Sequence, residues 1–439
     1  MKSRKAASRK RSAKAEKSRV GRQIKIRMYN VGFGDSFLLR VPTNDGERRI
    51  LVDCGFHSQG KGKFSDQDLV KQIKADLKGE PLHVVVATHR HQDHISGFGE
   101  KALWTDVGVE EVWLPFTANP EPVREEPGLR LWNAFMDKAN GLWDAAGKLT
   151  PAAISALGAR SAEQEAAEFM LWNARANAPA IENLLNDLKR ADGRPAKRRF
   201  LPEDKRRYPS QLVTPALPGI KTYVLGPPTD SQFRKQRNVP SSWGFGDETP
   251  SGTGGQSSEI APPFSAEWRI PAKRLPPRRP FRDKTVKFIR RFNEDLHYAA
   301  KALEGFLNGE SIVLVLEVGS ARLLLPGDAE VGTWTAIMNN AAALELAASA
   351  TFLKVGHHGS HNATPITFID KHLPKKTPAM ISTQEGPGSY RNAIPLKELL
   401  KRMKVREMPY VRSDKPPIES DGIFTPDPHE RWVDCFIPC

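Results

Sequence analysis

Four side chains that can bind a metal ion lie within six residues of the sequence, at His89, His91, Asp93 and His94. They follow residues 82–87, a largely apolar and β-branched run that predicts a buried strand. Because alternate residues of an extended chain share a face, His89 and His91 are expected to point one way, and a tighter turn then sends Asp93 and His94 toward a second point. The motif therefore predicts ligands for two adjacent metal ions, with zinc, manganese and iron all suited to imidazole and carboxylate.

A second group of histidines begins at His357 and His358, directly after a predicted strand at 351–355. Asp53 and Asp328 also stand at predicted strand ends, each near a glycine, and loops at such ends often supply functional groups. Alone, Asp53 is read as a turn residue and Asp328 as a turn or helix-capping residue. Together with the histidines they suit a two-metal hydrolytic site, in which a carboxylate bridges ions about 3.5–4 Å apart and bound water becomes a hydroxide nucleophile.

Five motifs occur in an order that one family shares. In chain order they are the Val-Gly-x-Gly-Asp-Ser turn at 31–36, Asp-x-Gly at 53–55, His-x-His-x-Asp-His at 89–94, a hairpin from Ser311 to Gly-Asp at 327–328, and Lys-Val-x-His-His-Gly-Ser at 354–360. Through them the sequence resembles the metallo-β-lactamase-fold hydrolases over about residues 24–114 and 311–382. It is most similar to the branch that contains the hydrolase domain of the bacterial DNA-uptake (competence) channel, and the channel's membrane part has no counterpart here.

The resemblance implies an α/β fold, a four-layer αββα sandwich with a dinuclear metal site at one edge. His89 and His91 are expected to bind one ion, while Asp93, His94 and one histidine of the His357-His358 pair bind the other. His357 is favoured because it is the first residue after the strand and its glycine, and His358 is then expected to lie behind the ligands or face the substrate. Asp93 and the bridging Asp328 are the expected catalytic carboxylates.

One position departs from the wider family, in which a third histidine for the first ion precedes the bridging aspartate. Here no histidine lies between His94 and His297, and His297 falls in a predicted helix and is read as an ordinary packing or surface residue. The competence branch has an Asn or Asp just before the strand, which Asn308 matches. An amide oxygen is a weaker ligand than an imidazole, so the first ion is expected to be loosely held, exchangeable, or manganese rather than the zinc that is expected for the site as a whole. Residues expected to orient ligands or border the site are Asp35, Ser36, Asp53, His358 and Ser360.

Charge is unevenly distributed along the chain. The net charge is +15, but it is concentrated at residues 1–27, 194–208 and 272–291, and the remainder is net negative. Clustered cations displace counterions from phosphates, which favours a nucleic acid or another polyanion as partner. The alternative is that the basic arm at 1–22 is a disordered, solubilising terminus. No apolar run is long enough to cross a bilayer, the start lacks a secretory pattern, and three cysteines make no disulfide framework, so the cytoplasm is expected.

The organisation expected from composition is a hydrolase domain at 23–439 with an insertion at about 115–310. The insertion is expected to be helical at 127–190 and flexible at 229–282, where Pro, Gly and Ser are frequent. Three functions remain open: a metal-dependent phosphodiesterase or nuclease, a hydrolase of a carboxylic ester, lactone, thioester or lactam, and a non-catalytic nucleic-acid-binding component. Neither substrate, protein partners nor oligomeric state follows from the sequence, because specificity depends on loops around the site.

Overall fold

The computed structural model describes residues 22–57, 60–119, 178–230, 233, 307–385 and 394–439. These residues form two β-sheets, of eight strands in the order β14-β15-β1-β2-β3-β4-β5-β6 and of seven in the order β13-β12-β11-β10-β9-β8-β7. The first sheet contains β1 (Gln23–Tyr29), β2 (Ser36–Thr43), β3 (Gly46–Cys54), β4 (Leu82–Val86), β5 (Val109–Pro115), β6 (Lys197–Leu201), β14 (Phe424–Pro426) and β15 (Trp432–Pro438). The second contains β7 (Ser210–Leu212), β8 (Lys221–Gly226), β9 (Val313–Val318), β10 (Ala321–Leu325), β11 (Phe352–Lys354), β12 (Ala379–Ile381) and β13 (Tyr410–Arg412).

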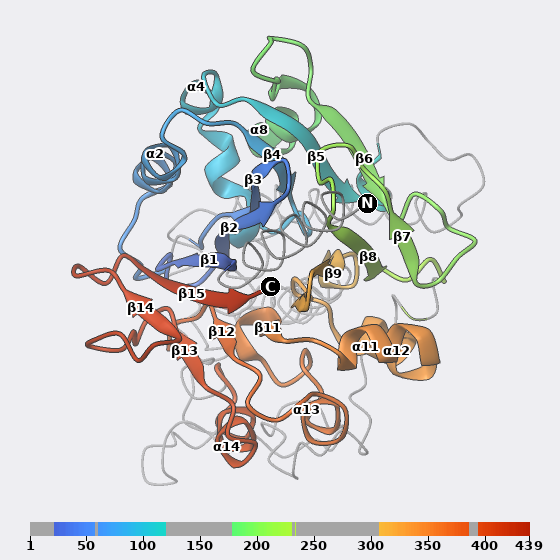
Figure 1. The fold of residues 1–439 in the computed structure, drawn as a ribbon. Helices are drawn as coiled ribbons and strands as arrows, with labels where there is room; N and C mark the ends of the chain where they lie inside the picture. Colours follow the sequence, from blue (N-terminus) through green and yellow to red (C-terminus); the bar gives the residue numbers. More distant parts are fainter. Residues whose placement is uncertain (1–21, 58–59, 120–177, 231–232, 234–306, 386–393) are drawn as a thin grey trace, which may run out of the picture.

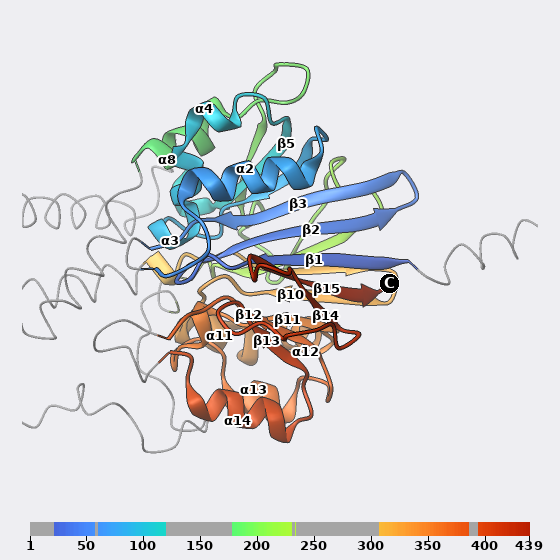
Figure 2. The ribbon, with the colours of Figure 1, turned by 90° about the vertical axis from the view of Figure 1, so that its left-hand side faces the viewer.

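Helices cover the outer face of each sheet, so the predicted four-layer αββα sandwich is confirmed. Figure 2 shows the layers from top to bottom, with α2 above the first sheet and α13 and α14 below the second; Figure 1 shows α11 and α12 beside them. The helices are α2 (Asp66–Leu77), α3 (Gln92–Ile95), α4 (Lys101–Trp104), α8 (Ala178–Glu182), α11 (Val331–Asn339), α12 (Ala341–Ala348), α13 (Ile366–Lys371) and α14 (Lys397–Val405). No helix in the described ranges has the length and apolar character to cross a membrane.

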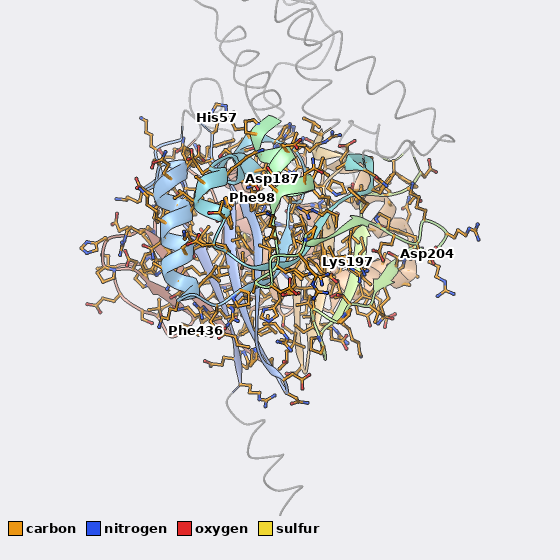
Figure 3. All side chains as sticks on the ribbon, turned by 90° about the horizontal axis from the view of Figure 1, so that it is seen from above. His57, Phe98, Asp187, Lys197, Asp204 and Phe436 are labelled. Carbon is orange, nitrogen blue, oxygen red and sulfur yellow. The ribbon has the colours of Figure 1, made fainter. Side chains whose placement is uncertain are left out.

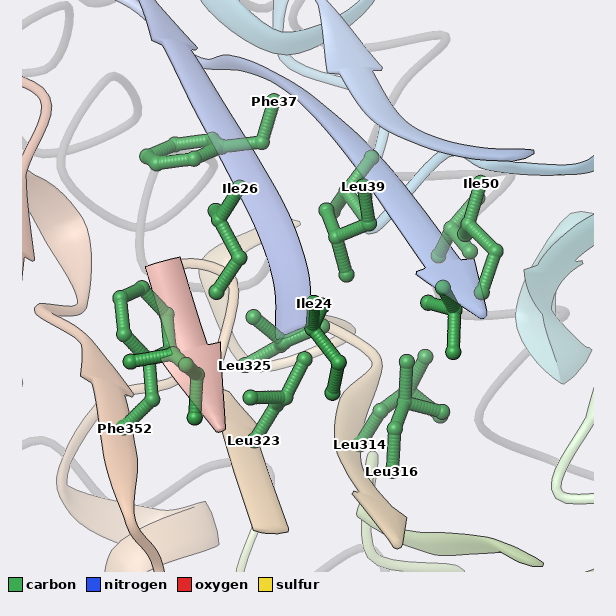
Figure 4. Packing of buried hydrophobic residues seen from close by; sticks show 14 of the residues in the cluster. Ile24, Ile26, Phe37, Leu39, Ile50, Leu314, Leu316, Leu323, Leu325 and Phe352 are labelled. Atoms are coloured by element: carbon green, nitrogen blue, oxygen red, sulfur yellow. The ribbon is translucent and has the colours of Figure 1, made fainter. Parts of the chain in front are cut away.

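The main core lies between the two sheets, where alternate strand residues from both sheets meet. Ile24 and Ile26 of β1 pack in one cluster with Leu314 of β9, Leu323 of β10 and Phe352 of β11 (Figure 4). Ile24, Ile26 and Met28 alternate in the sequence with Lys25 and Arg27, and this period-2 pattern predicts the buried face, since successive strand side chains point to opposite sides. Each fully buried aliphatic side chain of this kind contributes roughly 1.5–3 kcal/mol.

The strands predicted at 82–87 and 351–355 are confirmed as β4 and β11, with small shifts at their ends, and the apolar spacing of Leu69, Val70, Ile73 and Leu77 predicts the helix α2. The largely apolar sequence over 331–347 predicts a single helix, but the structure has two helices there, α11 and α12, which meet at Asn340. The Asn340 side chain accepts a hydrogen bond from the Ala343 amide at 3.0 Å and so caps the start of α12. Asparagine competes well for such backbone donors, which explains the break within an otherwise apolar stretch.

The expected insertion at 115–310 contributes more to the fold than its composition indicated. Three of its strands belong to the two sheets: β6 pairs with β5, and β7 and β8 extend the second sheet. The basic run at 194–208 concealed β6, which is an edge strand with three cations among its five residues. Helical structure was expected over 127–190, and the part of this range that the structure describes contains α8 and a π-helical turn at Asn183–Asp187. Almost all of the basic arm at 1–22 and of the flexible expectation at 229–282 lies outside the described residues.

A buried carboxylate, Glu111, ties the edge of the first sheet to the segment that leads into the second. It accepts hydrogen bonds from Arg199 Nε at 2.8 Å, Thr214 Oγ1 at 2.6 Å and Trp113 Nε1 at 2.9 Å. Replacing Glu111 with alanine is expected to lower the free energy of unfolding by about 3–5 kcal/mol, because three buried donors lose their acceptor and Arg199 keeps only the partly exposed Glu203 as an ionic partner.

Urea unfolding followed by circular dichroism measures that loss. The matched control is Glu110→Ala on the same strand, whose partly exposed side chain lies 3.7 Å from Arg190 and whose removal is expected to cost less than about 1 kcal/mol. Equal losses in the two variants would contradict the stabilising role given to the buried network.

Candidate metal centre

The predicted ligands converge at one edge of the sandwich, where parallel strands from both sheets end. β3 and β4 run parallel in the first sheet, as do β10, β11 and β12 in the second. Asp53 lies at the end of β3, the motif at 89–94 follows β4, Asp328 follows β10, and the histidine pair follows β11. Helix α3, which carries Asp93 and His94, marks this edge at the left of Figure 2. Chain segments more than 200 residues apart thus meet at this edge.

Asp93, His94, Asp328 and His358 form the tightest group of ligand atoms. Four atoms, one from each side chain, all lie within 4.8 Å of one another, and all four residues are buried. The Oδ2 atom of Asp328 lies 3.0 Å from His94 Nε2 and 3.6 Å from His358 Nε2. His358 Nε2 lies 3.0 Å from Asp93 Oδ2. Tetrahedral zinc with bonds of about 2.0–2.2 Å separates its ligand atoms by roughly 3.3–3.6 Å, so this donor set fits a divalent ion.

Hydrogen bonds behind the two central imidazoles fix which nitrogen faces the group. His94 Nδ1 donates to Asp53 Oδ2 at 2.8 Å, and Thr88 donates to the same carboxylate through its amide and its hydroxyl. His358 Nδ1 donates to the carbonyl oxygen of Ser382 at 3.0 Å. Metal-bound histidines are usually held in this way, with the second ring nitrogen on a carboxylate or backbone carbonyl. Both Nε2 atoms are therefore presented to the same point.

The order of the histidine pair differs from the expectation drawn from the sequence. His358, not His357, joins Asp93 and His94 in the cluster. The ring of His357 is directed elsewhere, 2.9 Å from Ser360 Oγ and 3.4 Å from Asn308 Nδ2. His357 and His358 have φ values of 46° and 53°, and this left-handed turn brings the second histidine of the pair into the cluster. Position in the sequence could not reveal it.

His89 and His91 lie beside this cluster and contact each other. His89 Nε2 is 2.9 Å from His91 Nδ1, and the rings of His89 and His94 have centroids 4.1 Å apart. His91 Nε2 and Asn308 Oδ1 are buried and accept or donate no hydrogen bond within the described part of the chain. The Asn308 amide is oriented by donation from Nδ2 to Glu330 Oε1 at 2.8 Å. The structure thus brings His89 and His91 together and places Asn308 next to His357.

The surroundings favour the metal-binding forms of Asp93, Asp328, His89 and His91, whereas the neighbouring carboxylates, against the effect of burial, raise the pKa of His94 and His358. Burial disfavours the charged forms of Asp93 and Asp328, yet the neighbouring His94 and His358 hold the pKa of both carboxyl groups below its usual range. Burial lowers the pKa of His91 to about 4 and, with His94 and His91 beside it, that of His89 well below its usual value. Carboxylates and neutral imidazoles are the protonation states in which these residues coordinate metals.

The remaining predicted residues lie around the cluster at different depths. The Asp35 amide donates to the Asp93 carbonyl oxygen at 2.9 Å, and the Asp35 carboxylate pairs with Lys354. Ser36 is fully buried at the start of β2, and Ser360 contacts His357. Sequence reasoning gave no separate role to Lys354 or Ser382. Lys354 could have been noticed in the sequence, because it is a lysine within a short apolar strand. Ser382 could not, because it contacts His358 through its backbone carbonyl, which every residue type has.

Gly55 shows why the Asp-x-Gly motif needs its glycine. A Cβ atom at this position would lie 2.5 Å from the Gln92 carbonyl oxygen and 2.6 Å from the Ile95 amide nitrogen. The backbone after Asp53 therefore packs directly against the turn that carries Asp93 and His94. Only glycine allows this approach, so the motif positions two parts of the site at once.

The sequence model of the metallo-beta-lactamase superfamily matches residues 29–131. One similar solved structure is that of Zn²⁺-bound PqqB from Methylobacterium extorquens, at 10% identity and a TM-score of 0.36, with 89% of this chain and 98% of that chain covered. No curated protein matches the sequence. The specific likeness to the competence branch stays a prediction. Residues 29–131 thus match the metallo-β-lactamase superfamily, and the αββα sandwich is the fold that this resemblance implies.

Proposed function

We propose that this protein is a metal-dependent hydrolase whose centre is formed by Asp93, His94, Asp328 and His358. The observation that carries the proposal is the convergence of these four buried ligand atoms within 4.8 Å. A divalent ion held there would acidify a water molecule to a hydroxide near neutral pH. His89 and His91, with Asn308 as a further candidate, are the proposed ligands of a second ion, zinc first and manganese as the alternative.

The protein's own groups have distinct tasks in this proposal. His94 and His358 present Nε2, and Asp53 and the Ser382 carbonyl hold those rings in place. Asp93 and Asp328 supply negative oxygens that accept the positive charge of an ion. Because all of these groups are buried, their charges act in a medium of low dielectric constant and attract a cation strongly.

The proposed substrate is a phosphodiester, in a nucleic acid or a nucleotide. β5 and β6 run parallel to β3 and β4, so the carboxyl end of β6 faces the same edge as the ligands. The loop after it contains Lys205 and the exposed Arg206 and Arg207. Figure 3 marks Lys197 at the start of β6 and Asp204 in this loop, which projects from the body on the side away from α2. Clustered cations attract a phosphate backbone, which favours this class over uncharged esters and lactams.

A substrate panel tests the proposal. Purified protein, with its zinc and manganese content measured, is offered labelled DNA, labelled RNA, bis-p-nitrophenyl phosphate, a chromogenic lactam and a thioester. The proposal is supported if the protein hydrolyses phosphodiesters and a chelator abolishes this turnover. Asp93→Ala should also abolish it, whereas the control Asp106→Ala, at an exposed site, should retain it. Turnover of carbonyl substrates alone would replace the substrate class. Nucleic-acid binding without any turnover would favour a non-catalytic role.

Replacing Asp53 with asparagine is expected to weaken zinc binding by about 10–100-fold, the usual effect of losing the group behind a ligand. The amide offers its N–H₂ group toward His94 Nδ1 and so favours the wrong tautomer of the ring. Competition with a chromogenic chelator measures the affinity, and Asp45→Asn in an exposed turn is the matched control. Equal affinities for Asp53→Asn and the control would remove Asp53 from the site.

A further inference from the structure

Lys354 brings a positive charge into the centre of the site. It is the last residue of β11, it is 3% exposed, and its ammonium group forms an ion pair with Asp35. The Nζ atom also donates to the Gly327 carbonyl oxygen at 3.1 Å and lies 3.5 Å from Asp328 Oδ1. Lysine is rarely buried unless it is paired, and here each contact is an oxygen beside or within the proposed ligand set.

The two oxygens of Asp328 have different surroundings. Oδ2 faces the Nε2 atoms of His94 and His358, at 3.0 and 3.6 Å. Oδ1 accepts a hydrogen bond from the His357 amide at 3.1 Å and lies beside the Lys354 ammonium. The carboxylate is therefore fixed in rotation, with one oxygen toward the imidazoles and the other toward two donors of the protein.

We propose that Lys354 is a positioning residue that reserves Oδ1 of Asp328, so that this aspartate offers a single oxygen to the metal. Asp35 is the anchor of the ammonium group, and its carboxylate lies 3.7 Å from His94 Nδ1 and 3.8 Å from His358 Nδ1, on the nitrogens that do not face the proposed ion. The proposal rests on the metal centre proposed above and adds how the protein sets its coordination and its affinity.

The Lys354–Asp35 pair has an electrostatic consequence that distinguishes it from a simple structural salt bridge. Removing the ammonium makes the site more negative and frees Oδ1 to bind the same ion. Removing the Asp35 charge leaves Lys354 with Asp328 as its remaining carboxylate partner at close range, so the ammonium competes directly with a bound cation. Loss of a structural ion pair would weaken the site in the same direction whichever partner is changed.

Cobalt(II) binding to the full-length protein tests the proposal without reference to activity. We expect Lys354→Met to bind Co²⁺ at least about tenfold more tightly and Asp35→Asn at least about tenfold more weakly than the wild type, since a unit charge at 4 Å interacts strongly even at intermediate dielectric. The visible absorption per bound Co²⁺ is expected to weaken in Lys354→Met, because a second Asp328 oxygen raises the coordination number. In Asp35→Asn the spectrum is expected to keep its wild-type shape.

Matched controls come from an exposed pair, Lys74 and Asp106, which are 2.6 Å apart on the surface. Lys74→Met and Asp106→Asn are expected to leave affinity and spectrum unchanged. Shifts of the same sign in Lys354→Met and Asp35→Asn, or a wild-type spectrum in Lys354→Met, would overturn the proposal. Failure of the wild type to bind Co²⁺ or Zn²⁺ would instead overturn the metal centre itself. If Lys354→Met does not fold, Asp35→Asn with the double variant Asp35→Asn/Lys354→Met decides: the double must bind more tightly than the single.

Discussion

Replacing His94 with alanine is expected to abolish stoichiometric metal binding and to reduce hydrolysis by about 10³-fold or more, well beyond the loss caused by removing a group behind a ligand. In the described part of the chain, His94 belongs to two groups of potential ligand atoms, the cluster with Asp93, Asp328 and His358 and a second group with Asp35 and Asp53. Its Nε2 atom lies 3.0 Å from Asp328 and its Nδ1 atom 2.8 Å from Asp53. Without the ring, two buried carboxylates face each other across an empty space.

The measurement is metal content per chain together with initial rates on the phosphodiester panel. The matched control is His429→Ala, at an exposed position, which is expected to behave as the wild type. Added imidazole is expected to restore part of the activity of His94→Ala, because it fills the space and supplies the missing nitrogen. The central role of His94 would be contradicted if His94→Ala kept its full metal content and lost less than about tenfold in rate. A loss that small is below the usual effect of removing a group that only orients a ligand.

Four buried carboxylates near His94 change the pKa of its imidazole. Asp328, Asp93, Asp53 and Asp35 surround the ring and, against the effect of burial, raise the pKa of His94 well above its usual value. A cation and a proton compete for the same Nε2 atom, so metal affinity of the wild type is expected to increase as pH rises.

Local periodicity and motif spacing predicted the parts of this protein that depend on near neighbours. The alternation in β1 placed Ile24 and Ile26 in the core, and the buried run before His89 placed the motif at a strand end. Asp53 and Asp328 were predicted as members of one site because both stand at strand ends, where loops often supply functional groups, and the structure brings both to His94. These predictions needed only the period of a strand and the chemistry of the side chains.

Features that depend on backbone conformation or on distant packing were not predictable. The basic composition of β6 concealed a strand, because an edge strand tolerates charged residues that a central one would exclude. The break at Asn340 depends on a capping bond that competes with a continuous helix. Lys354 belongs to a recognised motif, but only the fold shows that its ammonium group forms an ion pair with Asp35, more than 300 residues earlier in the sequence.

The histidine pair after β11 gives the sharpest test of what the fold adds to the sequence. We expect His358→Ala to lose more than about 100-fold in activity and metal affinity, and His357→Ala to lose less than about tenfold. These values lie above and below the range of about 10–100-fold that is usual when a group behind a ligand is removed. His358 Nε2 lies among the carboxylates of Asp93 and Asp328, whereas His357 contacts Ser360 and Asn308. The two variants have the same composition and adjacent positions, so each is the control of the other.

Chelator competition and rates on one substrate, measured for both variants under the same conditions, decide between them. A larger loss in His357→Ala would restore the assignment based on residue order and would mean that the left-handed turn at 357–358 rearranges when an ion binds. Equal, large losses would indicate that both rings are ligands, with His357 and the neighbouring Asn308 amide completing the position next to His91. A loss confined to His358→Ala would assign one ion to the cluster of Asp93, His94, Asp328 and His358. In the described chain, His94 and His358 are the two imidazoles that group with the carboxylates of Asp93 and Asp328.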